Sequence, residues 1–363
     1  MILTKKKSKT FSIYATNISG LGAVSCVTSL IPKLAKNHFE RIDKIFFPDT
    51  KAFNFIHDIK NINIILYKRY LPNSISRFLE IFFWNTTISS QPTLILGDVP
   101  YRLLSMQIIF LHSTLIIEDF AEHNFYEKTK FKILRLMFSK NSSKISAVIV
   151  QTEIMKDLLI KKYPRFGSKV FVVHLPPPEI FIPYKNARKN KKRAEAFSSL
   201  SLFYPSSFYS HKNHIFLSSL SPNFSSINEL ILTIDQTSNP VPHAKCVKCI
   251  GAINSKDTLA YYLETDALVF FSLTESLGLP LLEAMWIGLP IIAPDLPYAR
   301  YLCGDEAIYF DPNEFKTFEE AVNLLIKKLN SGWYPNWSNY IKKFPSDWDS
   351  VASSFLNIMD SHT

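Results

Sequence analysis

The chain has 363 residues, of which 47% are hydrophobic and 20% are charged, and its formal net charge is +10. This length predicts two domains, each large enough for its own hydrophobic core. The sequence contains no low-complexity tract and no run of 18 apolar residues. A disordered chain and a membrane-spanning helix are therefore not expected.

The charge is spread unevenly along the chain. Residues 1–180 hold 25 Lys and Arg against 13 Asp and Glu, residues 181–200 hold 6 against 1, and residues 201–363 hold 10 against 17. This asymmetry predicts that only the first half meets a polyanion, either an anionic membrane leaflet or a nucleic acid. No basic-aromatic motif of an RNA- or DNA-binding module appears, which argues against nucleic acid. The alternative is a lysine-rich surface that contacts only solvent.

The N-terminus and the cysteines predict a cytoplasmic protein. The lysines at 5–7 are followed by residues 11–22, which are too polar for the apolar region of a signal peptide. The four cysteines are scattered and show no disulfide framework, as expected in a reducing compartment. Cys246 and Cys249 with His243 supply only part of a zinc site, and no second pair follows at short spacing. We expect no metal.

The first half of the chain alternates between predicted strands and helices. A strand at 11–15 runs into a loop with Gly20 and Gly22 and then into a helix at 24–34, which is typical of a nucleotide-binding half-domain. His112 ends a later strand, where functional residues of open α/β sheets lie, although a structural role is the alternative. The further strands are predicted at 44–47, 62–67, 92–98, 107–112, 146–150 and 170–174.

Residues 68–84 combine aromatic side chains with Lys68, Arg69 and Arg77, and Ser74 could cap a helix there. This composition suits a helix that lies on a membrane surface. A core helix packed on the sheet is an equally good interpretation.

The strand and helix pattern restarts after residue 200. A basic run at 185–193 follows a proline cluster, which is the composition of an exposed linker. We predict a Rossmann-like domain at 1–180, a basic linker at 181–200, a second Rossmann-like domain at 201–345 and a C-terminal helix at 346–363 that could return to either domain. In the second half, strands are predicted at 201–204, 229–235, 246–250, 267–271, 289–293 and 307–310, and helices at 215–220, from 258, from 278, at 318–329 and at 350–359. This alternation predicts two doubly wound α/β domains.

The most informative stretch runs from residue 267 to residue 285. An apolar strand ends in a polar turn, and Gly278 and Pro280 then open a helix. Free backbone N–H groups and the positive end of the helix dipole make such a place an anion site. Glu275 and Glu283 flank it, and they would repel a phosphate unless they faced hydroxyl groups. A ligand with a phosphate between hydroxyl groups is a nucleotide sugar. The alternative is that neither glutamate binds a ligand, one being a first-turn glutamate favoured by the helix dipole and the other a surface glutamate.

The same stretch, Ser-Leu-Thr-Glu-Ser-Leu-Gly-Leu-Pro-Leu-Leu-Glu-Ala-Met, resembles the signature of the retaining glycosyltransferases of family 4, with seven residues between Glu275 and Glu283. The similarity is strong over residues 200–312 and weaker over 11–34, 93–112 and 146–175. It implies the GT-B fold, with two Rossmann-like doubly wound domains facing a central cleft. It also implies transfer of a sugar from a nucleotide-sugar donor with retention of configuration.

The resemblance implies a role for each matching residue of the second half. Glu275 would accept hydrogen bonds from the transferred sugar and Glu283 from the ribose, while Lys212 would neutralise the leaving diphosphate. Many family members carry an arginine five residues before this lysine, where the present chain has Ser207; His211 is a candidate replacement. Backbone groups expected to hold the diphosphate belong to Ser276, Leu277, Gly278 and Leu279.

The first half would complete the site. Gly20 and Gly22 match the glycine loop near the donor phosphates, and His112 matches a histidine that contacts the donor sugar. No Asp-x-Asp motif lies in a loop, so neither a metal nor another cofactor is expected.

The expected function is transfer to a saccharide or lipid-linked saccharide at the inner face of the membrane, in cell-surface polysaccharide biosynthesis of the O-antigen, capsule or lipopolysaccharide type. The alternatives are a GT-B epimerase, a phosphorylase, which would need pyridoxal phosphate, and a non-catalytic saccharide-binding scaffold protein. The motifs do not identify the base or the sugar of the donor.

Overall fold

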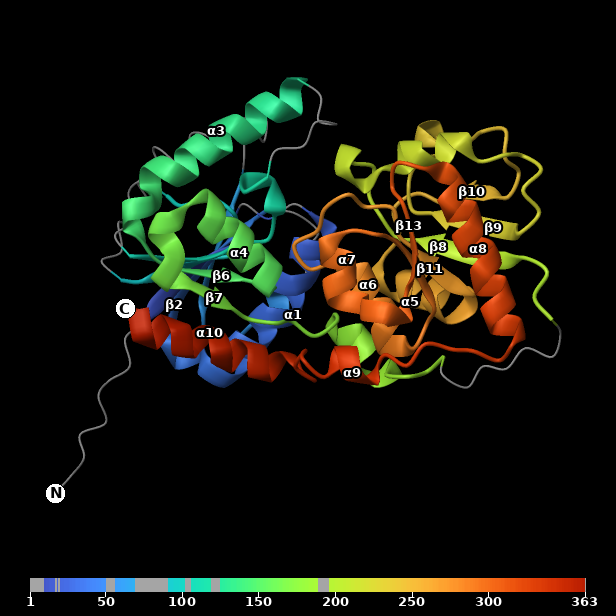
Figure 1. Cartoon of the computed structure of the whole chain (residues 1–363). Coiled ribbons are helices and arrows are strands. Elements are labelled where there is room, and N and C mark those ends of the chain that lie inside the picture. The colour runs from blue at the N-terminus through green and yellow to red at the C-terminus, as the bar shows by residue number, and fades with distance from the viewer. Residues whose placement is uncertain are drawn as a thin grey trace. The chain divides into compact units, whose positions relative to one another are not determined.

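The computed structural model describes residues 10–16, 18, 20–49, 56–68, 91–101, 106–118, 125–188 and 196–362 (Figure 1). The contacts of the chain divide it into two compact units. Unit 1 comprises Met1–Leu175 and Pro345–Thr363, and unit 2 comprises Pro176–Phe344. The helix predicted at 68–84 lies, apart from Lys68, outside the described residues.

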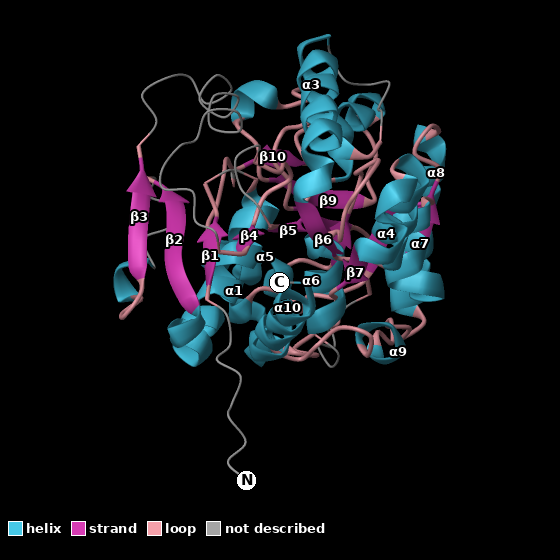
Figure 2. Cartoon of the chain, turned by 90° about the vertical axis from the view of Figure 1, so that its left-hand side faces the viewer, coloured by secondary structure: helices cyan, strands magenta, loops and turns pink. Residues whose placement is uncertain are grey.

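Unit 1 contains a seven-stranded parallel sheet in the order β3-β2-β1-β4-β5-β6-β7. The central strands β1, β4, β5 and β6 are nearly continuous apolar runs, as expected for parallel strands that are buried on both faces, whereas the edge strand β3 is partly exposed. Figure 2 shows β3, β2 and β1 side by side in this order. The strands are β1 (Phe11–Tyr14), β2 (Ile42–Pro48), β3 (Asn63–Tyr67), β4 (Thr93–Ile95), β5 (Gln107–Phe110), β6 (Ile145–Val150) and β7 (Val170–Val172).

The helices of unit 1 come from both ends of the chain. Within the described residues they are α1 (Leu21–His38), α3 (Phe125–Asn141), α4 (Glu153–Lys162) and α10 (Trp348–His362). α10, the last helix, packs against α1 (Figure 1). The Asp349 carboxylate of α10 accepts a hydrogen bond of 2.6 Å from the Asn37 amide, and Asp360 pairs with the Arg41 guanidinium. The C-terminal helix therefore returns to unit 1, a choice that the sequence left open.

Unit 2 contains a six-stranded parallel sheet in the order β10-β9-β8-β11-β12-β13. The first four strands of each unit thus follow the doubly wound order 3-2-1-4. The strands are β8 (Leu200–Tyr204), β9 (Ile227–Leu232), β10 (Val247–Cys249), β11 (Ala267–Val269), β12 (Ile291–Pro294) and β13 (Ile308–Phe310). The helices are α5 (Ser255–Glu264), α6 (Leu279–Ile287), α7 (Pro297–Cys303), α8 (Phe315–Asn330) and α9 (Ser338–Ile341).

Residues 183–187 of the predicted linker are exposed, whereas Phe181 and Arg188 on either side of them are buried in unit 2. Phe181 is 1% exposed and Arg188 is 8% exposed. The Arg188 guanidinium donates to the carbonyls of Leu263 and Thr265, at 2.8 and 2.5 Å. These buried carbonyl partners offset the desolvation of the charge, which composition alone does not reveal.

The helix predicted at 215–220 is a 3-10 helix, His214–Ser219. The residue before it, Asn213, has a left-handed backbone with φ of +54°, and Pro222 follows closely. The serines at 218, 219 and 221 favour turns over an α-helix interior. The segment is therefore too short and too turn-prone for α-helical geometry.

Among the described residues, no helix combines the length and the apolar character needed to cross a lipid bilayer.

Candidate functional site

The predicted residues of unit 2 lie at the switch point of its sheet. β8 and β11 are neighbours, and the chain leaves them toward opposite edges of the sheet. Lys212 lies in the loop that follows β8, and Glu275 lies in the turn that follows β11. Ligands of open α/β sheets bind at the carboxyl ends of strands beside such a switch point.

Lys212 and Glu275 form an ion pair. The Lys212 Nζ lies 2.5 Å from the Glu275 Oε1, and the two side chains are only 16% and 11% exposed. The ammonium also lies 5.8 Å from the centre of the Phe270 ring. The structure thus brings together a cation and a carboxylate that are 63 residues apart in the chain.

Hydrogen bonds between the two loops hold this pair in place. The His211 carbonyl accepts from the Leu273 N–H at 2.8 Å and from the Ser272 hydroxyl at 3.3 Å. The hydroxyl of Tyr204, at the end of β8, donates to the Lys212 carbonyl at 2.7 Å. The backbone on either side of the pair is therefore fixed before any ligand arrives.

Gly278 precedes α6 in a conformation that requires glycine. Its φ and ψ are +74° and +54°, in the left-handed region. A Cβ at this position would lie 3.2 Å from the Leu302 Cδ1 and 3.3 Å from the Leu281 Cδ1. Both the backbone conformation and the close packing therefore disfavour a larger residue.

The start of α6 presents unpaired backbone donors. Within the described part of the chain, no hydrogen bond occupies the N–H groups of Leu277, Gly278 and Leu279. Pro280 at the start of the helix has no N–H to contribute. Ser276 belongs to the same turn. The arrangement has the unpaired donors and the dipole orientation that bind anions.

Glu283 is a buried carboxyl in α6, not a surface glutamate. It is 8% exposed, and its Oε2 lies 2.9 Å from the hydroxyl of Tyr262 in α5. Burial raises the pKa of Glu283 to about 7, and the hydrogen bond from Tyr262 opposes this shift. Burial and the nearby Glu283 raise the pKa of Tyr262 well above its usual range. Glu283 can therefore exchange a proton near neutral pH.

Ser207 occupies the loop position where the family pattern has an arginine. Its carbonyl accepts from the Tyr209 N–H at 3.0 Å and from the Ser206 hydroxyl at 3.2 Å. The His211 ring stacks on Tyr209, with ring centres 5.7 Å apart and planes at 8°. The replacement of the arginine by either Ser207 or His211 stays a prediction.

Three predicted residues belong to unit 1. Gly20 is the N-cap of α1, with extended backbone, and no heavy atom lies within 4 Å of where its Cβ would be. Gly22 lies in the first turn of the same helix. His112 follows β5, and its backbone N–H donates to the Asp98 Oδ1 at 2.8 Å. That these residues bind the same donor as the residues of unit 2 stays a prediction.

The His112 ring is neutral at physiological pH. Its two ring nitrogens are buried and have no hydrogen-bond partner within the described residues. Burial lowers the pKa of His112 to about 3. Such a ring can donate and accept one hydrogen bond each, which suits a sugar hydroxyl.

Sequence reasoning did not identify the residues that position the pair and the buried carboxyl. Tyr262 and Asp98 contact residues that are 21 and 14 positions away in the chain, and Tyr204 contacts Lys212, eight positions away. No spacing within the sequence signals such contacts. Only the carboxyl-end position of Asp98 after β4 was a usable signal.

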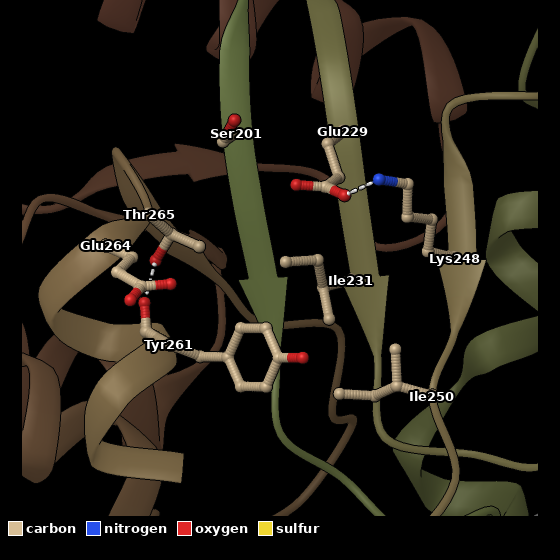
Figure 3. Close-up of a pocket in the computed structure, with 8 residues that line it drawn as sticks. All are labelled: Ser201, Glu229, Ile231, Lys248, Ile250, Tyr261, Glu264 and Thr265. Atoms are coloured by element: carbon tan, nitrogen blue, oxygen red, sulfur yellow. Dashed lines mark hydrogen bonds and ion pairs between the residues drawn. The ribbon is translucent and has the colours of Figure 1, made fainter. Parts of the chain in front are cut away.

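A pocket of about 250 Å³ lies elsewhere in unit 2, between the sheet and α5 (Figure 3). The Glu229 carboxylate and the Lys248 ammonium, both in its lining, form an ion pair. Its lining consists of Ser201, Glu229, Ile231, Lys248, Ile250, Tyr261, Glu264 and Thr265. None of the predicted site residues lines this pocket.

Cys246 and Cys249, which resembled half of a zinc site, are free thiols. The His243 Nε2 lies 3.1 Å from the Leu220 carbonyl oxygen. Across the described ranges, no three His, Cys, Asp or Glu side chains gather in a way that could hold a metal ion.

The architecture and the strand-end residues agree with a comparison to known protein families. Residues 243–344 match the model of the Glycosyl transferases group 1 family. The matched part of unit 2 includes Glu275, α6 and Glu283.

Individual proteins share this similarity. The O-antigen chain mannosyltransferase RfbU of Salmonella typhimurium is 23% identical over 259 residues, 68% of this chain and 67% of RfbU. The crystal structure of Anabaena Alr3699/HepE in complex with UDP has a TM-score of 0.61 at 14% identity, covering 97% of this chain and 100% of that one. WaaG, a glycosyltransferase involved in lipopolysaccharide biosynthesis, has a TM-score of 0.59 at 12% identity, covering 95% and 99%. The fold of two parallel α/β units is that of the GT-B glycosyltransferases.

Proposed function

We propose that the protein is a retaining glycosyltransferase of family 4 that transfers a sugar from a nucleotide-sugar donor. The observation that carries the proposal is the Lys212–Glu275 pair at the switch point of unit 2, beside the unpaired N–H groups at the start of α6. A saccharide or lipid-linked saccharide would be the acceptor, in O-antigen, capsule or lipopolysaccharide biosynthesis. The names of RfbU and WaaG support this choice of pathway.

Each group at the site has a part of the donor that it suits. The α6 N-terminus and Lys212 would bind the diphosphate, Glu283 would accept from the ribose hydroxyls, and Glu275 from the sugar hydroxyls. Contributions from Gly20, Gly22 and His112 to the same donor rest on the sequence resemblance. The proposal requires no metal and no other cofactor.

The reaction breaks the bond between the anomeric carbon and the terminal phosphate oxygen of the donor. Negative charge builds on that oxygen as the bond breaks, and the acceptor hydroxyl forms the new bond and loses its proton. A fixed cation and preset N–H donors stabilise the developing charge without reorganising. Lys212 and the N–H groups of Leu277 to Leu279 are placed to do this, and no carboxylate is assigned as a nucleophile.

The first experiment is a thermal-shift screen against UDP, GDP, dTDP and ADP sugars, followed by donor-turnover assays. Lys212→Ala is expected to lower kcat about 10²-fold, because it removes the cation that stabilises the leaving group. Glu283→Ala is expected to weaken donor binding with a smaller effect on kcat. Lys316→Ala, which removes an exposed lysine of α8, is the matched control. Full activity in the Lys212 variant would contradict its role.

The same assays separate the alternative functions. An epimerase would convert the donor without an acceptor, and a phosphorylase would show the absorbance of pyridoxal phosphate. Tight glycan binding with no turnover of any donor would indicate a non-catalytic scaffold.

We extend the proposal to a peripheral contact between unit 1 and the inner face of an anionic membrane. Residues 128–141 of α3 contain four lysines and one arginine and no acidic residue. Ile133 and Leu136 of this helix are 42% and 53% exposed, and Lys128, Lys130, Lys132 and Lys140 are exposed as well. Exposed apolar side chains among lysines are typical of helices that lie in a membrane interface.

A further inference from the structure

The Lys212–Glu275 pair joins two groups that the proposed function assigns to different parts of the donor. Lys212 is assigned to the diphosphate and Glu275 to the sugar. In the structure each is the counter-ion of the other, with Nζ and Oε1 2.5 Å apart and both side chains largely buried. A diphosphate that binds Lys212 must therefore compete with Glu275 for the same ammonium.

When a diphosphate binds the Lys212 ammonium, Glu275 is left as a poorly solvated carboxylate beside the negative charge of the ligand. A buried charge that loses its only partner is strongly unfavourable. Hydroxyl groups that donate to the carboxylate offset this loss. The transferred sugar of a nucleotide sugar brings such hydroxyls to Glu275, whereas a nucleoside diphosphate, whose only sugar is the ribose assigned to Glu283, brings none.

We propose that Glu275 sets the specificity of the site for the nucleotide-sugar donor over the nucleoside diphosphate product. The carboxylate competes with the diphosphate for Lys212, and only a ligand with sugar hydroxyls relieves this competition. Product release is favoured for the same reason, because Lys212 returns to Glu275 once the sugar has left. This inference rests on the proposed function.

The competition predicts an unusual result for Glu275→Gln. The amide keeps the size of the side chain and can still accept from sugar hydroxyls, but it no longer neutralises Lys212. The variant is expected to bind UDP or GDP about tenfold more tightly than the wild type, since breaking a close ion pair is no longer required. Binding of the corresponding nucleotide sugar should change much less. The ratio of the two dissociation constants should therefore fall about tenfold.

Isothermal titration calorimetry of the full chain with UDP, GDP, UDP-glucose and GDP-mannose measures this ratio. Glu283→Gln is the matched control, because ribose is present in both kinds of ligand and both affinities should fall by the same factor. Lys212→Met should weaken binding of the bare diphosphates. Thermal unfolding shows whether each variant is folded. If Glu275→Gln does not fold, Glu275→Ser takes its place in the comparison.

The outcomes separate this inference from the proposed function. If Lys212→Met weakens binding while the Glu275 variant binds UDP and GDP no more tightly than the wild type, Glu275 does not compete for Lys212 and the inference is wrong, although the proposed function stands. If neither the wild type nor any variant binds a nucleotide sugar or nucleoside diphosphate of the UDP, GDP, dTDP and ADP series, both are wrong. The inference is supported if the Glu275 variant binds UDP or GDP more tightly than the wild type and the Glu283 variant does not.

Discussion

Glu283 connects the site to the stability of the fold. Its pKa is about 7 in the folded protein and has a reference value of 4.5. The folded chain therefore binds more protons than the unfolded chain between these values. The free energy of unfolding should fall as pH rises from about 4.5 to about 7 and then level off, by up to about 3 kcal/mol in total.

Glu283→Gln should abolish this part of the pH dependence, because the amide does not ionise and still accepts from Tyr262. Urea unfolding of both proteins across this pH range measures the difference. Glu264→Gln, which changes an exposed carboxyl at the end of α5, is the control and should leave the slope unchanged. Equal slopes for Glu283→Gln and the wild type would show that Glu283 is not the titrating group.

The sequence was informative about the residues of the site that belong to one local motif. Glu275, Gly278 and Glu283 follow one strand in a strand–turn–helix segment, so their relation could be predicted from spacing. The partners could not be predicted in this way, because Tyr262 meets Glu283 only through the packing of α5 beside α6. The pairing of Lys212 with Glu275 likewise depends on β8 and β11 being neighbours in the sheet.

The start of α6 depends on Gly278. Gly278→Ala is expected to destabilise the protein by more than about 1 kcal/mol, because a left-handed backbone disfavours a Cβ and because Leu302 and Leu281 would have to shift to admit one. Gly332 has a φ of +81° but no heavy atom within 4 Å of where its Cβ would be. Gly332→Ala therefore measures the backbone effect alone.

Chemical denaturation of the two alanine variants gives the comparison. The loss for Gly278→Ala should exceed that for Gly332→Ala, with the excess coming from close packing. Equal losses would mean that the neighbours of Gly278 move aside easily and that the start of α6 is less constrained than its contacts indicate.

α3 offers a test of membrane contact. Vesicles of phosphatidylglycerol and phosphatidylcholine should bind the protein at low ionic strength, and vesicles of phosphatidylcholine alone should bind it much less. Ile133→Ser combined with Leu136→Ser should reduce binding about tenfold, because it removes the apolar contacts of the exposed face.

Leu324→Ser is the matched control, since Leu324 is a leucine of α8 in unit 2 that is 44% exposed. It should leave vesicle binding unchanged. If the α3 variant binds the mixed vesicles as well as the wild type, the apolar face of α3 is not a membrane contact. Indifference of the wild type to anionic vesicles would remove the membrane proposal altogether.

The strands were easier to predict than the helices. A buried parallel strand is a continuous apolar run between turn residues, and each predicted strand appears in the described structure within a few residues. α3 was missed because exposed Ile133 and Leu136 interrupt the contrast between an apolar and a polar face. These two exposed side chains do not pack on the sheet, and they belong to the face for which we propose a membrane contact.

The two units of the molecule are not two consecutive halves of the chain. Unit 1 is built from the first 175 residues and from a segment that returns after unit 2 has been completed. Sequence periodicity predicted both domains and the last helix. It could not predict which domain the helix joins, since that depends on Asn37 and Arg41 of unit 1 meeting Asp349 and Asp360.

If α10 is part of unit 1, a core substitution in it should affect that unit first. Phe355 of α10 is 1% exposed, and its ring lies 5.0 Å from that of Phe110 at the end of β5. Phe355→Ala should lower stability by about 3 kcal/mol and speed amide hydrogen exchange in peptides of β5 and α1. Phe318→Ala, a fully buried substitution in α8, should instead speed exchange in unit 2. Uniformly faster exchange in both units with either variant would show that the two units unfold as a single cooperative structure, and the contacts of α10 would then stabilise the entire chain.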